Sequence, residues 1–452
     1  MHKIYTPTKL LIMLISIILL SANFSNAQNN KLVLVSPHQE GIRTEFENAF
    51  VEWCQRELNQ QVKLEWLDVG GGTSTIRRRI RSDFQRSSEG INIDLLFGGG
   101  TEIFLGFAEE GLLHPYKLPD EQLAKIPAEL LGNRLYDSEY RWYGTAISGF
   151  GIIYNEVLRK RLKLPKVQNW IDLINPRLMN RVGAADPRES GSAHMMYELI
   201  LQAYGWEEGF RNLFEIAGNV KTFPAASSQI PQDVATGRVI YGFAIDFYAY
   251  QQIAVVGSDK LGYVVPADTG VFTPDSIGIL KGAPNLELAQ KFVEFVLSEE
   301  GQKLWMLKKG ESDGPKEFNL NRASVLPELY EKLGERNTVS VNPFTFESDF
   351  KYDFQKGGDR WVIVNDLIGA LIIDPHKQLV DAWKAINASK NVKNKEAALK
   401  EFSKLPLSEQ EALELAKGEW NTDSVLRNQT KVEWSSFARD KYRRAKDLAK
   451  GK

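Results

Sequence analysis

The apolar positions of the first hundred residues switch repeatedly between two spacings. Apolar and polar residues alternate in short runs such as 31–36 (KLVLVS), which predicts strands. Between these runs apolar residues recur every three or four positions, which predicts helices. The expected strands are 31–36, 62–66 and 91–97, and the expected helices are 42–58, 76–84 and 101–111. This strand–helix rhythm is typical of a parallel sheet with helices on its faces.

A second block of the same kind follows further along the chain. Its expected strands are 181–186, 219–223 and 239–245, and the helical periodicity after each strand covers 190–205, a stretch after Ser228, and 246–255. Two long segments that contain glycine and β-branched residues, 142–155 and 261–280, join the blocks. We therefore expect two α/β lobes with hinge crossings near both segments, so that the first lobe is discontinuous.

Both ends of the chain carry further segments. A basic start, the apolar run 10–20 and a small-residue motif ending at Ala27 predict a secretory signal peptide that is removed after Ala27. A membrane anchor is the alternative, but the apolar run is short for a bilayer span. The expected domains are a signal peptide at 1–27, a first lobe at 28–141 and 281–330, a second lobe at 142–280, and a mainly helical C-terminal extension at 331–452.

The C-terminal part is expected to be helical almost throughout. Residues 285–307 have the pattern of one amphipathic helix that returns to the first lobe, and 361–373 are strongly apolar. Further helices are expected at 381–386, 396–402 and 407–415, with a basic surface helix at 434–452.

Composition and charge narrow the classes of function. The 452 residues have a net charge of −2, whereas a dedicated nucleic-acid binder would show a basic excess. Cys54 is the single cysteine, so neither an internal disulfide nor a zinc cluster of cysteines can form. It falls on the apolar side of a predicted helix, and we interpret it as a core residue.

Glycine and hydroxyl residues gather where predicted strands end and helices start. These strand ends are Ser36 to His38, Gly70 to Thr75, Gly98 to Thr101, Asp186 to Ser192, Ala226 to Ser228 and Asp246 to Tyr248. Ligands of such sheets bind beyond the carboxyl ends of the strands, and helix starts offer free N–H groups with partial positive charge. If the lobes face each other, the segments converge on a cleft suited to an anion. Each segment alone could equally be an ordinary helix cap.

Nucleotide-binding and catalytic motifs do not match. No lysine follows the glycine triplet as a phosphate loop requires, and the first strand lacks Gly-x-Gly-x-x-Gly. Neither a Gly-x-Ser-x-Gly elbow nor a His-Glu-x-x-His helix occurs. His38 and His194 lie near predicted strand ends, and we interpret them as structural, with a shared site as the alternative. The basic run behind the triplet is expected to form a solvated face of Arg77, Arg78, Arg79 and Arg81.

Four stretches together resemble the extracellular solute-binding proteins of bacterial ABC importers, in the branch that includes ferric-iron, phosphonate and sugar-phosphate binders. They are SPHQEGIRTEFENAF, WYGTAISGFGIIYN, DPRESGSAHMMYELILQAYGWEEG and GVFTPDSIGILKGAPNLELAQKFVEFVLSEEGQKLW. The resemblance covers about residues 31–330. It implies the α/β periplasmic binding fold of type 2, with two lobes of mainly parallel sheet, flanking helices and two hinge crossings. It does not extend to residues 331–452.

The resemblance implies ligand contacts at Ser36 and His38, in the hinge at Ser148, at the helix start 190–192, and at Asp246 and Tyr248. The argument from strand ends adds other positions. The complete set of candidate ligand-binding residues is Ser36, His38, Gly72, Thr73, Gly100, Thr101, Ser148, Ser190, Gly191, Ser192, Ser228, Asp246 and Tyr248.

Ferric-binding members of the branch carry an adjacent tyrosine pair near the last strand, where this chain has Asp246-Phe247-Tyr248-Ala249-Tyr250. A single tyrosine there supplies fewer phenolate ligands for a hard trivalent cation.

The resemblance implies a periplasmic receptor that closes around a small anionic solute bearing a phosphate, phosphonate or carboxylate group. The closed form would dock on an ABC permease in the inner membrane. We expect no catalytic residue, metal or cofactor, no nucleic-acid partner, and a monomer. A ferric-iron carrier using His38, Tyr248 and Tyr250 is the alternative within the family. An exported hydrolase of a small phosphoester is the alternative from another class.

Overall fold

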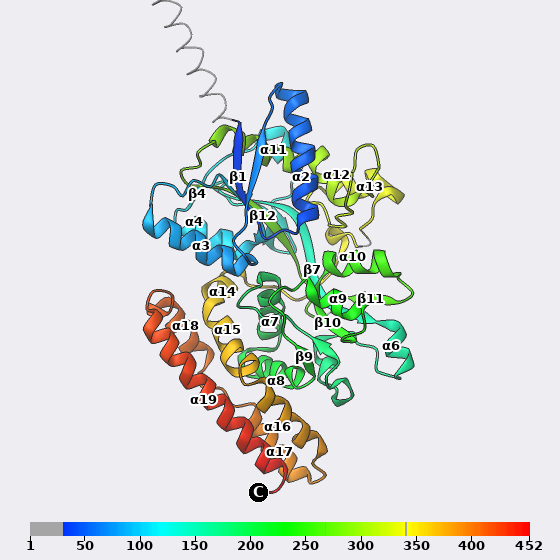
Figure 1. Ribbon diagram of the computed structural model, residues 1–452, viewed down its shortest axis with the longest axis vertical. Helices are drawn as coiled ribbons and strands as arrows, with labels where there is room; N and C mark the ends of the chain where they lie inside the picture. Colours follow the sequence, from blue (N-terminus) through cyan, green and yellow to red (C-terminus); the bar gives the residue numbers. More distant parts are fainter. Residues whose placement is uncertain (1–29, 267, 340) are drawn as a thin grey trace, which may run out of the picture.

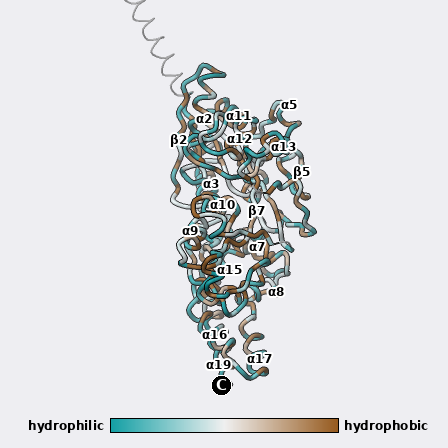
Figure 2. The backbone as a smooth tube through the Cα atoms, turned by 90° about the vertical axis from the view of Figure 1, so that its right-hand side faces the viewer, coloured by the Kyte–Doolittle hydropathy of each residue, from teal (hydrophilic) through white to brown (hydrophobic). Residues whose placement is uncertain are grey.

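The computed structural model describes residues 30–266, 268–339 and 341–452, and the predicted signal peptide lies outside these residues. Two α/β lobes follow one another along the long axis, and a helical extension, coloured orange to red, occupies the end opposite to the first lobe (Figure 1). The view from the side shows the same order, with α2 and α11 near one end and α17 and α19 at the other (Figure 2).

The first lobe is built on three parallel strands whose order in space is β2-β1-β3. Its elements are β1 (Lys31–Val35), α2 (Glu40–Trp53), β2 (Lys63–Leu67), α3 (Thr73–Arg86), β3 (Leu95–Gly100) and α4 (Thr101–Glu109), followed by the short β4 (Leu113–His114), α5 (Asp120–Leu123), β5 (Glu129–Leu130) and β6 (Asn133–Arg134). Cys54 begins a π-helical turn after α2 and is fully buried, as the apolar pattern predicts.

The second lobe repeats the arrangement with the order β10-β8-β9, again parallel. Its elements are α6 (Glu156–Arg161), β8 (Val182–Gly183), α7 (Gly191–Tyr204), α8 (Trp206–Ala217), β9 (Val220–Thr222), α9 (Gln229–Ala235), β10 (Tyr241–Ile245) and α10 (Asp246–Val256). Apolar side chains of α7, α8 and β10, such as Leu199, Phe210 and Phe243, are buried against the sheet and neighbouring helices.

One long strand runs through both lobes. The first half of β7 (Tyr143–Asn155) pairs with β12 (Phe272–Leu280), and its second half pairs with β10 and β11 (Leu261–Val264), all antiparallel. The change of partner falls between Gly149, opposite Phe272, and Phe150, opposite Ile245. Both segments expected as crossings are therefore strands, and they make the sheet mixed at its centre.

The return to the first lobe differs from the expected single helix. The structure has α11 (Leu286–Leu297) and α12 (Glu299–Met306), separated at Ser298, followed by α13 (Glu328–Leu333). Ser298 has extended backbone angles, and its hydroxyl accepts a bond from the N–H of Gly301 at 3.1 Å. This cap starts a second helix, which the continuous apolar pattern does not reveal.

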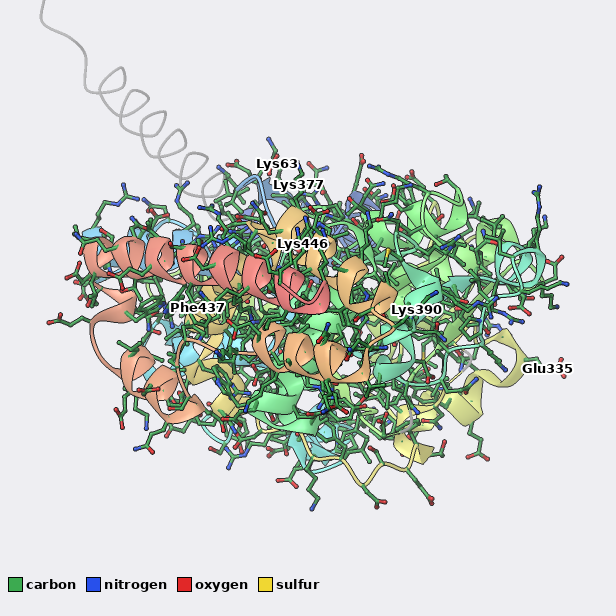
Figure 3. All side chains as sticks on the ribbon, turned by 90° about the horizontal axis from the view of Figure 1, so that it is seen from below. Lys63, Glu335, Lys377, Lys390, Phe437 and Lys446 are labelled. Carbon is green, nitrogen blue, oxygen red and sulfur yellow. The ribbon has the colours of Figure 1, made fainter. Side chains whose placement is uncertain are left out.

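The extension is a helical subdomain packed on the second lobe. It contains α14 (Phe354–Asp359), α15 (Trp361–Ile368), α16 (His376–Ala388), α17 (Val392–Phe402), α18 (Glu409–Lys417) and α19 (Ser424–Ala449). Figure 3 shows α19 across this end of the molecule with Phe437 and Lys446 along its length, and α17 packs beside it. Across the described ranges, no helix combines the length and apolar character needed to cross a membrane.

The expected basic surface helix at 434–452 is wrong in two respects. The helix α19 already begins at Ser424, and one of its faces is buried. On that face the Lys441 ammonium donates to the Lys404 carbonyl at 2.8 Å and lies 3.5 Å from the centre of the Phe214 ring in α8. The long apolar stem of lysine makes such a buried position possible when the amine finds a polar partner.

A buried ion pair joins the extension to α7. Arg360 and Glu198 are both fully buried, and the guanidinium donates from Nε at 2.9 Å and from Nη2 at 2.7 Å to the same carboxylate oxygen. In a second contact between the extension and this lobe, the Trp383 indole of α16 donates to Asn219 at 3.0 Å. These contacts fix the extension to the second lobe.

The ion pair predicts a large effect of a near-isosteric change. Glu198→Gln leaves the buried Arg360 guanidinium without its main counter-charge, so we expect the free energy of unfolding to fall by about 3 kcal/mol. Urea denaturation followed by circular dichroism measures the change. Arg79→Ala, which breaks the exposed pair with Asp83, is the control and is expected to change stability by less than about 1 kcal/mol. Equal effects of both variants would contradict the assignment.

Candidate ligand-binding site

A cavity of about 440 Å³ lies between the two lobes. The residues after β1, the end of β3, the start of β12 and the start of α3 border it from the first lobe. The start of α7, the segment 225–228 and the start of α10 border it from the second. The predicted residues that line it are His38, Gly72, Thr73, Gly100, Ser148, Ser190, Gly191, Ser192, Ser228 and Tyr248. Segments far apart in the sequence therefore meet as the strand-end rule anticipates.

Three predicted residues do not line the cavity. The Ser36 hydroxyl accepts from the N–H of His38 at 3.1 Å, and Thr101 is buried at the start of α4. The Asp246 carboxylate accepts from the N–H groups of Gly149 and Phe247, each at 2.7 Å. Burial raises the pKa of Asp246 to about 7, although the bond from Gly149 opposes this shift. Asp246 thus holds the backbone of the hinge strand β7.

The cavity floor contains a buried ion pair that the sequence did not reveal. Arg322 is 2% exposed, and its Nη1 donates to the Asp275 carboxylate while its Nη2 donates to the Ser148 hydroxyl at 2.8 Å. Asp275 belongs to β12 and Ser148 to β7, so the guanidinium connects the two strands that run between the lobes. His38 completes the cluster with its Nε2 2.7 Å from the same carboxylate.

The charge state of this cluster follows from its burial and its contacts. Burial alone would raise the pKa of Asp275, but the Arg322 guanidinium and His38 lower it well below its usual range. Burial lowers the pKa of His38, and the Asp275 carboxylate opposes the shift. The floor therefore carries a paired carboxylate and guanidinium beside a neutral imidazole that donates from Nε2.

Glycine at the end of β3 makes room for the His38 ring. Gly98 has a φ of 100°, and a Cβ atom at this position would lie 2.6 Å from Nε2 of His38. Both the backbone conformation and the close approach of the ring exclude a side chain here. The neighbouring Gly99 donates its N–H to Asp275, so the turn contributes directly to the cluster.

A cluster of hydroxyl groups faces the floor from the second lobe. The Ser190 hydroxyl donates to Ser227 at 3.0 Å and lies 3.2 Å from the Ser192 hydroxyl, which is 2.6 Å from Ser227. Ser190 also caps α7 by accepting from the N–H of Ala193 at 3.3 Å. The predicted set of contacts included Ser190, Ser192 and Ser228 but not Ser227, although the predicted strand end Ala226 to Ser228 contains it.

Two helices of the first lobe begin at the cavity without a capping side chain. The residues before α3 and α4 are Gly72 and Gly100, which have no side-chain oxygen to accept from the first N–H groups of each helix. Such helix starts carry unsatisfied donors and the positive end of the helix dipole. They can receive the oxygen atoms of an anion.

The lobes are in contact at these helix starts. A Cβ atom on Gly72 would lie 2.8 Å from the Glu189 carbonyl, and one on Gly191 would lie 2.9 Å from the Thr73 side chain. The Thr75 hydroxyl donates to the Glu189 carboxylate at 3.0 Å. The structure therefore has the lobes closed over this side of the cavity.

The expectation that the arginines of α3 form a solvated face is wrong for Arg77. Arg77 is buried, and its guanidinium lies over the Trp361 ring of α15 at 5.3 Å. Arg78 is exposed but reaches across to the second lobe, where it donates to the Arg188 carbonyl at 2.9 Å. The periodic pattern distinguishes apolar from polar positions, and it does not reveal that another part of the chain covers the polar face.

Metal ligands are sparse around the cavity. Among residues 30–266, 268–339 and 341–452, no three histidine, cysteine or carboxylate side chains lie close enough together to hold an ion. Tyr248 lines the cavity, whereas the ring of Tyr250 packs against Tyr263 at 5.4 Å. The two tyrosines of the ferric alternative are therefore not both at the cavity.

The cluster predicts a pH-dependent effect of removing its cation. Arg322→Met leaves the buried Asp275 carboxylate unpaired, so we expect the free energy of unfolding to fall by about 3 kcal/mol at pH 7. The pKa of Asp275 is lower in the folded protein than in the unfolded chain, so its ionised form stabilises the fold at pH values above the unfolded pKa. This stabilisation is lost as the pH falls from the unfolded pKa toward the folded one. The variant can protonate the carboxyl, so the difference should shrink at pH 4. Urea titrations at both pH values test this, and a difference independent of pH would contradict it.

Comparison with known proteins supports the fold and the family. The family model described as bacterial extracellular solute-binding protein matches residues 92–324. An uncharacterized protein of Haemophilus influenzae is 30% identical over 58% of this chain and 78% of its own length. The phosphoglycerate transport regulatory protein PgtC of Salmonella typhimurium is 28% identical over 54% of this chain and 57% of its own length.

Solved structures show the same fold. The periplasmic binding protein AfuA of Actinobacillus pleuropneumoniae, solved with fructose-6-phosphate, has a TM-score of 0.58 at 21% identity and covers 78% of this chain and 97% of its own. Iron-bound HitA of Pseudomonas aeruginosa has a TM-score of 0.57 at 20% identity and covers 75% of this chain and 99% of its own. Almost all of each neighbour is matched, while part of this chain has no counterpart in either.

The predicted α/β fold of type 2 and the predicted family are thus confirmed, and AfuA is described as a periplasmic binding protein. The chain belongs to the bacterial extracellular solute-binding proteins, the solute-binding components of ABC importers that its sequence resembles.

Proposed function

We propose that this protein captures a small anionic solute, bearing a phosphate, phosphonate or carboxylate group, in the cavity between its lobes and presents it to an ABC permease in the inner membrane. One observation carries the proposal. The uncapped starts of α3 and α4 and the serine cluster of α7 face one cavity from opposite lobes. Contacts that exist only when both lobes meet would favour the closed form on binding.

The donors of this cavity suit an oxyanion with several oxygen atoms. Backbone N–H groups and serine hydroxyls donate hydrogen bonds, and bonds to an ionised acceptor are the strong ones. Arg322 is already neutralised by Asp275, so the ion pair brings no net positive charge to the cavity. Selection would therefore depend on the geometry of the donors. A volume of about 440 Å³ lies within the range of small-molecule sites.

The names of two similar proteins point to the same chemistry. PgtC is described as a phosphoglycerate transport regulatory protein, and AfuA was solved with fructose-6-phosphate. Phosphoglycerate and fructose 6-phosphate are both phosphate esters of small hydroxylated carbon skeletons. We infer that a phosphate ester of this kind is the class of solute to test first.

The proposal also includes features that membership of the family does not establish. We propose that the chain is exported with cleavage after Ala27, acts in the periplasm as a monomer, binds no nucleic acid and catalyses no reaction. The net charge of −2 and the absence of a recognised nucleophile motif support the last two statements. Turnover of a phosphoester by the purified protein would instead favour the exported hydrolase.

Loss of two hydroxyls tests the proposed anion site. The double variant Ser190→Ala, Ser192→Ala removes two hydroxyl groups from the cavity lining, together with the Ser190 cap of α7, and we expect affinity to fall about tenfold or more. Isothermal titration calorimetry with 3-phosphoglycerate and fructose 6-phosphate measures it. The control is Ser87→Ala, Ser88→Ala, in an exposed turn of the first lobe. Unchanged affinity of the cavity variant for a probe that binds the parent would rule out these serines as contacts.

The ferric alternative makes an opposite prediction. With Tyr248 but not Tyr250 at the cavity, we expect the purified protein to remain colourless when ferric citrate is added. A visible charge-transfer band that disappears in Tyr248→Phe would favour an iron carrier. Inorganic phosphate and the two phosphate esters serve as parallel additions in the same thermal-shift series, where a bound ligand raises the melting temperature.

A further inference from the structure

The segment between Tyr352 and Trp361 lies where the two lobes and the extension meet. The Tyr352 hydroxyl donates to the Glu102 carboxylate at 3.0 Å, and Glu102 belongs to the first turn of α4 in the first lobe. Trp361, the first residue of α15, lies under the Arg77 guanidinium of α3. Both Glu102 and Trp361 also line the ligand cavity.

The other side of the same segment is held by the second lobe. The Trp361 ring stacks on His194 of α7, with 3.8 Å between ring centres and 23° between planes. His194 is fully buried and its Nδ1 lies 2.7 Å from the Asn365 side-chain oxygen. With the buried pair of Arg360 and Glu198 one residue away, this side of the segment is firmly attached.

The two attachments differ in kind. On the second lobe the contacts are an ion pair, a ring stack and a hydrogen bond between fully or almost fully buried groups. On the first lobe they are one hydrogen bond to Glu102, one cation–ring contact from Arg77 and the packing of the short α14 against α4. Rotation of the lobes about β7 would break the contacts with the first lobe, because these are fewer and weaker than the contacts with the second lobe.

The Trp361 ring also limits the cavity. The side chain is 3% exposed and belongs to the residues that line the cavity. The ring therefore forms part of the cavity wall. A wall residue fixed between Arg77 and His194 cannot turn away to admit a larger ligand.

We propose that the C-terminal extension is a working part of the solute site: the segment Tyr352–Trp361 is a third connection between the lobes, made only in the closed form, and Trp361 is the residue that sets the size limit of the cavity. This deepens the proposed function, because it assigns to residues outside the region matched by the family a role in closure and selection. The two strands β7 and β12 act as the permanent hinge, and this segment acts as a latch on the opposite side.

The closure part is tested without any ligand. Spin labels on Ser88→Cys in the first lobe and Lys166→Cys in the second report the distance between the lobes, and both positions are exposed. Burial raises the pKa of the native Cys54 thiol to about 12, so it stays unlabelled. We expect Trp361→Ala and Tyr352→Phe to shift the distance distribution toward longer values. Distributions identical to the parent in both variants would overturn the proposal.

The selection part uses 3-phosphoglycerate and fructose 6-phosphate as probes in calorimetry. We expect Trp361→Ala to lower the affinity for the more tightly bound probe about tenfold. Tyr352→Phe should lower the same affinity about fivefold, because it removes one hydrogen bond of the closed form. Trp361→Ala should also reduce the ratio of the affinities for the smaller and the larger ester. Parent affinity and an unchanged preference would overturn this part.

Trp434→Ala is the matched control. Trp434 is another buried tryptophan of the extension, stacked on Trp420 at 5.0 Å, and it is not among the residues that line the cavity. We expect it to lower stability while leaving the lobe distance and probe affinity as in the parent, and equal effects of both tryptophan variants would overturn the proposal. If neither ester binds the parent, the choice of solute fails, whereas the distance measurement still decides the role of the latch.

Discussion

The buried guanidinium of Arg322 is the constraint on which the arrangement of the lobes depends. Taking this charge out of water costs several kcal/mol unless it is paired and hydrogen-bonded. The Asp275 carboxylate and the Ser148 hydroxyl meet that need, and the rings of Phe247 and Trp305 lie 4.3 and 5.1 Å from the guanidinium. The partners come from the two hinge strands, the last segment of the first lobe and the second lobe. The floor of the cavity and the hinge are therefore one structure.

The layout of the cavity could be predicted because it follows from a local rule. Glycine and serine after a predicted strand mark the end of that strand and the start of a helix, and parallel strands bring such ends to one edge. This rule placed Gly72, Gly100 and Ser190 at the same cavity. It failed where a side chain has a second task, as with Asp246, whose carboxylate holds the hinge backbone instead of facing the cavity.

The groups that sequence reasoning missed have distant partners. Arg322 lies 47 residues from Asp275 and 174 from Ser148, and no spacing along the chain indicates either pair. The burial of Arg77 has the same origin, since the residue that covers it, Trp361, belongs to an extension outside the family resemblance. A pattern of apolar positions identifies the faces of a helix, but only the fold determines which polar face another segment covers.

Gly98 has a consequence for how this site can change through evolution. Its positive φ and the 2.6 Å approach of the His38 ring leave no space for a side chain. A substitution there would displace the imidazole from Asp275, and the buried carboxylate would lose one of its hydrogen-bond donors. Positions 38, 98, 275 and 322 should therefore vary together among related chains: a relative that carries a side chain at position 98 should also have replaced the histidine, and one that has lost the arginine should have lost the aspartate.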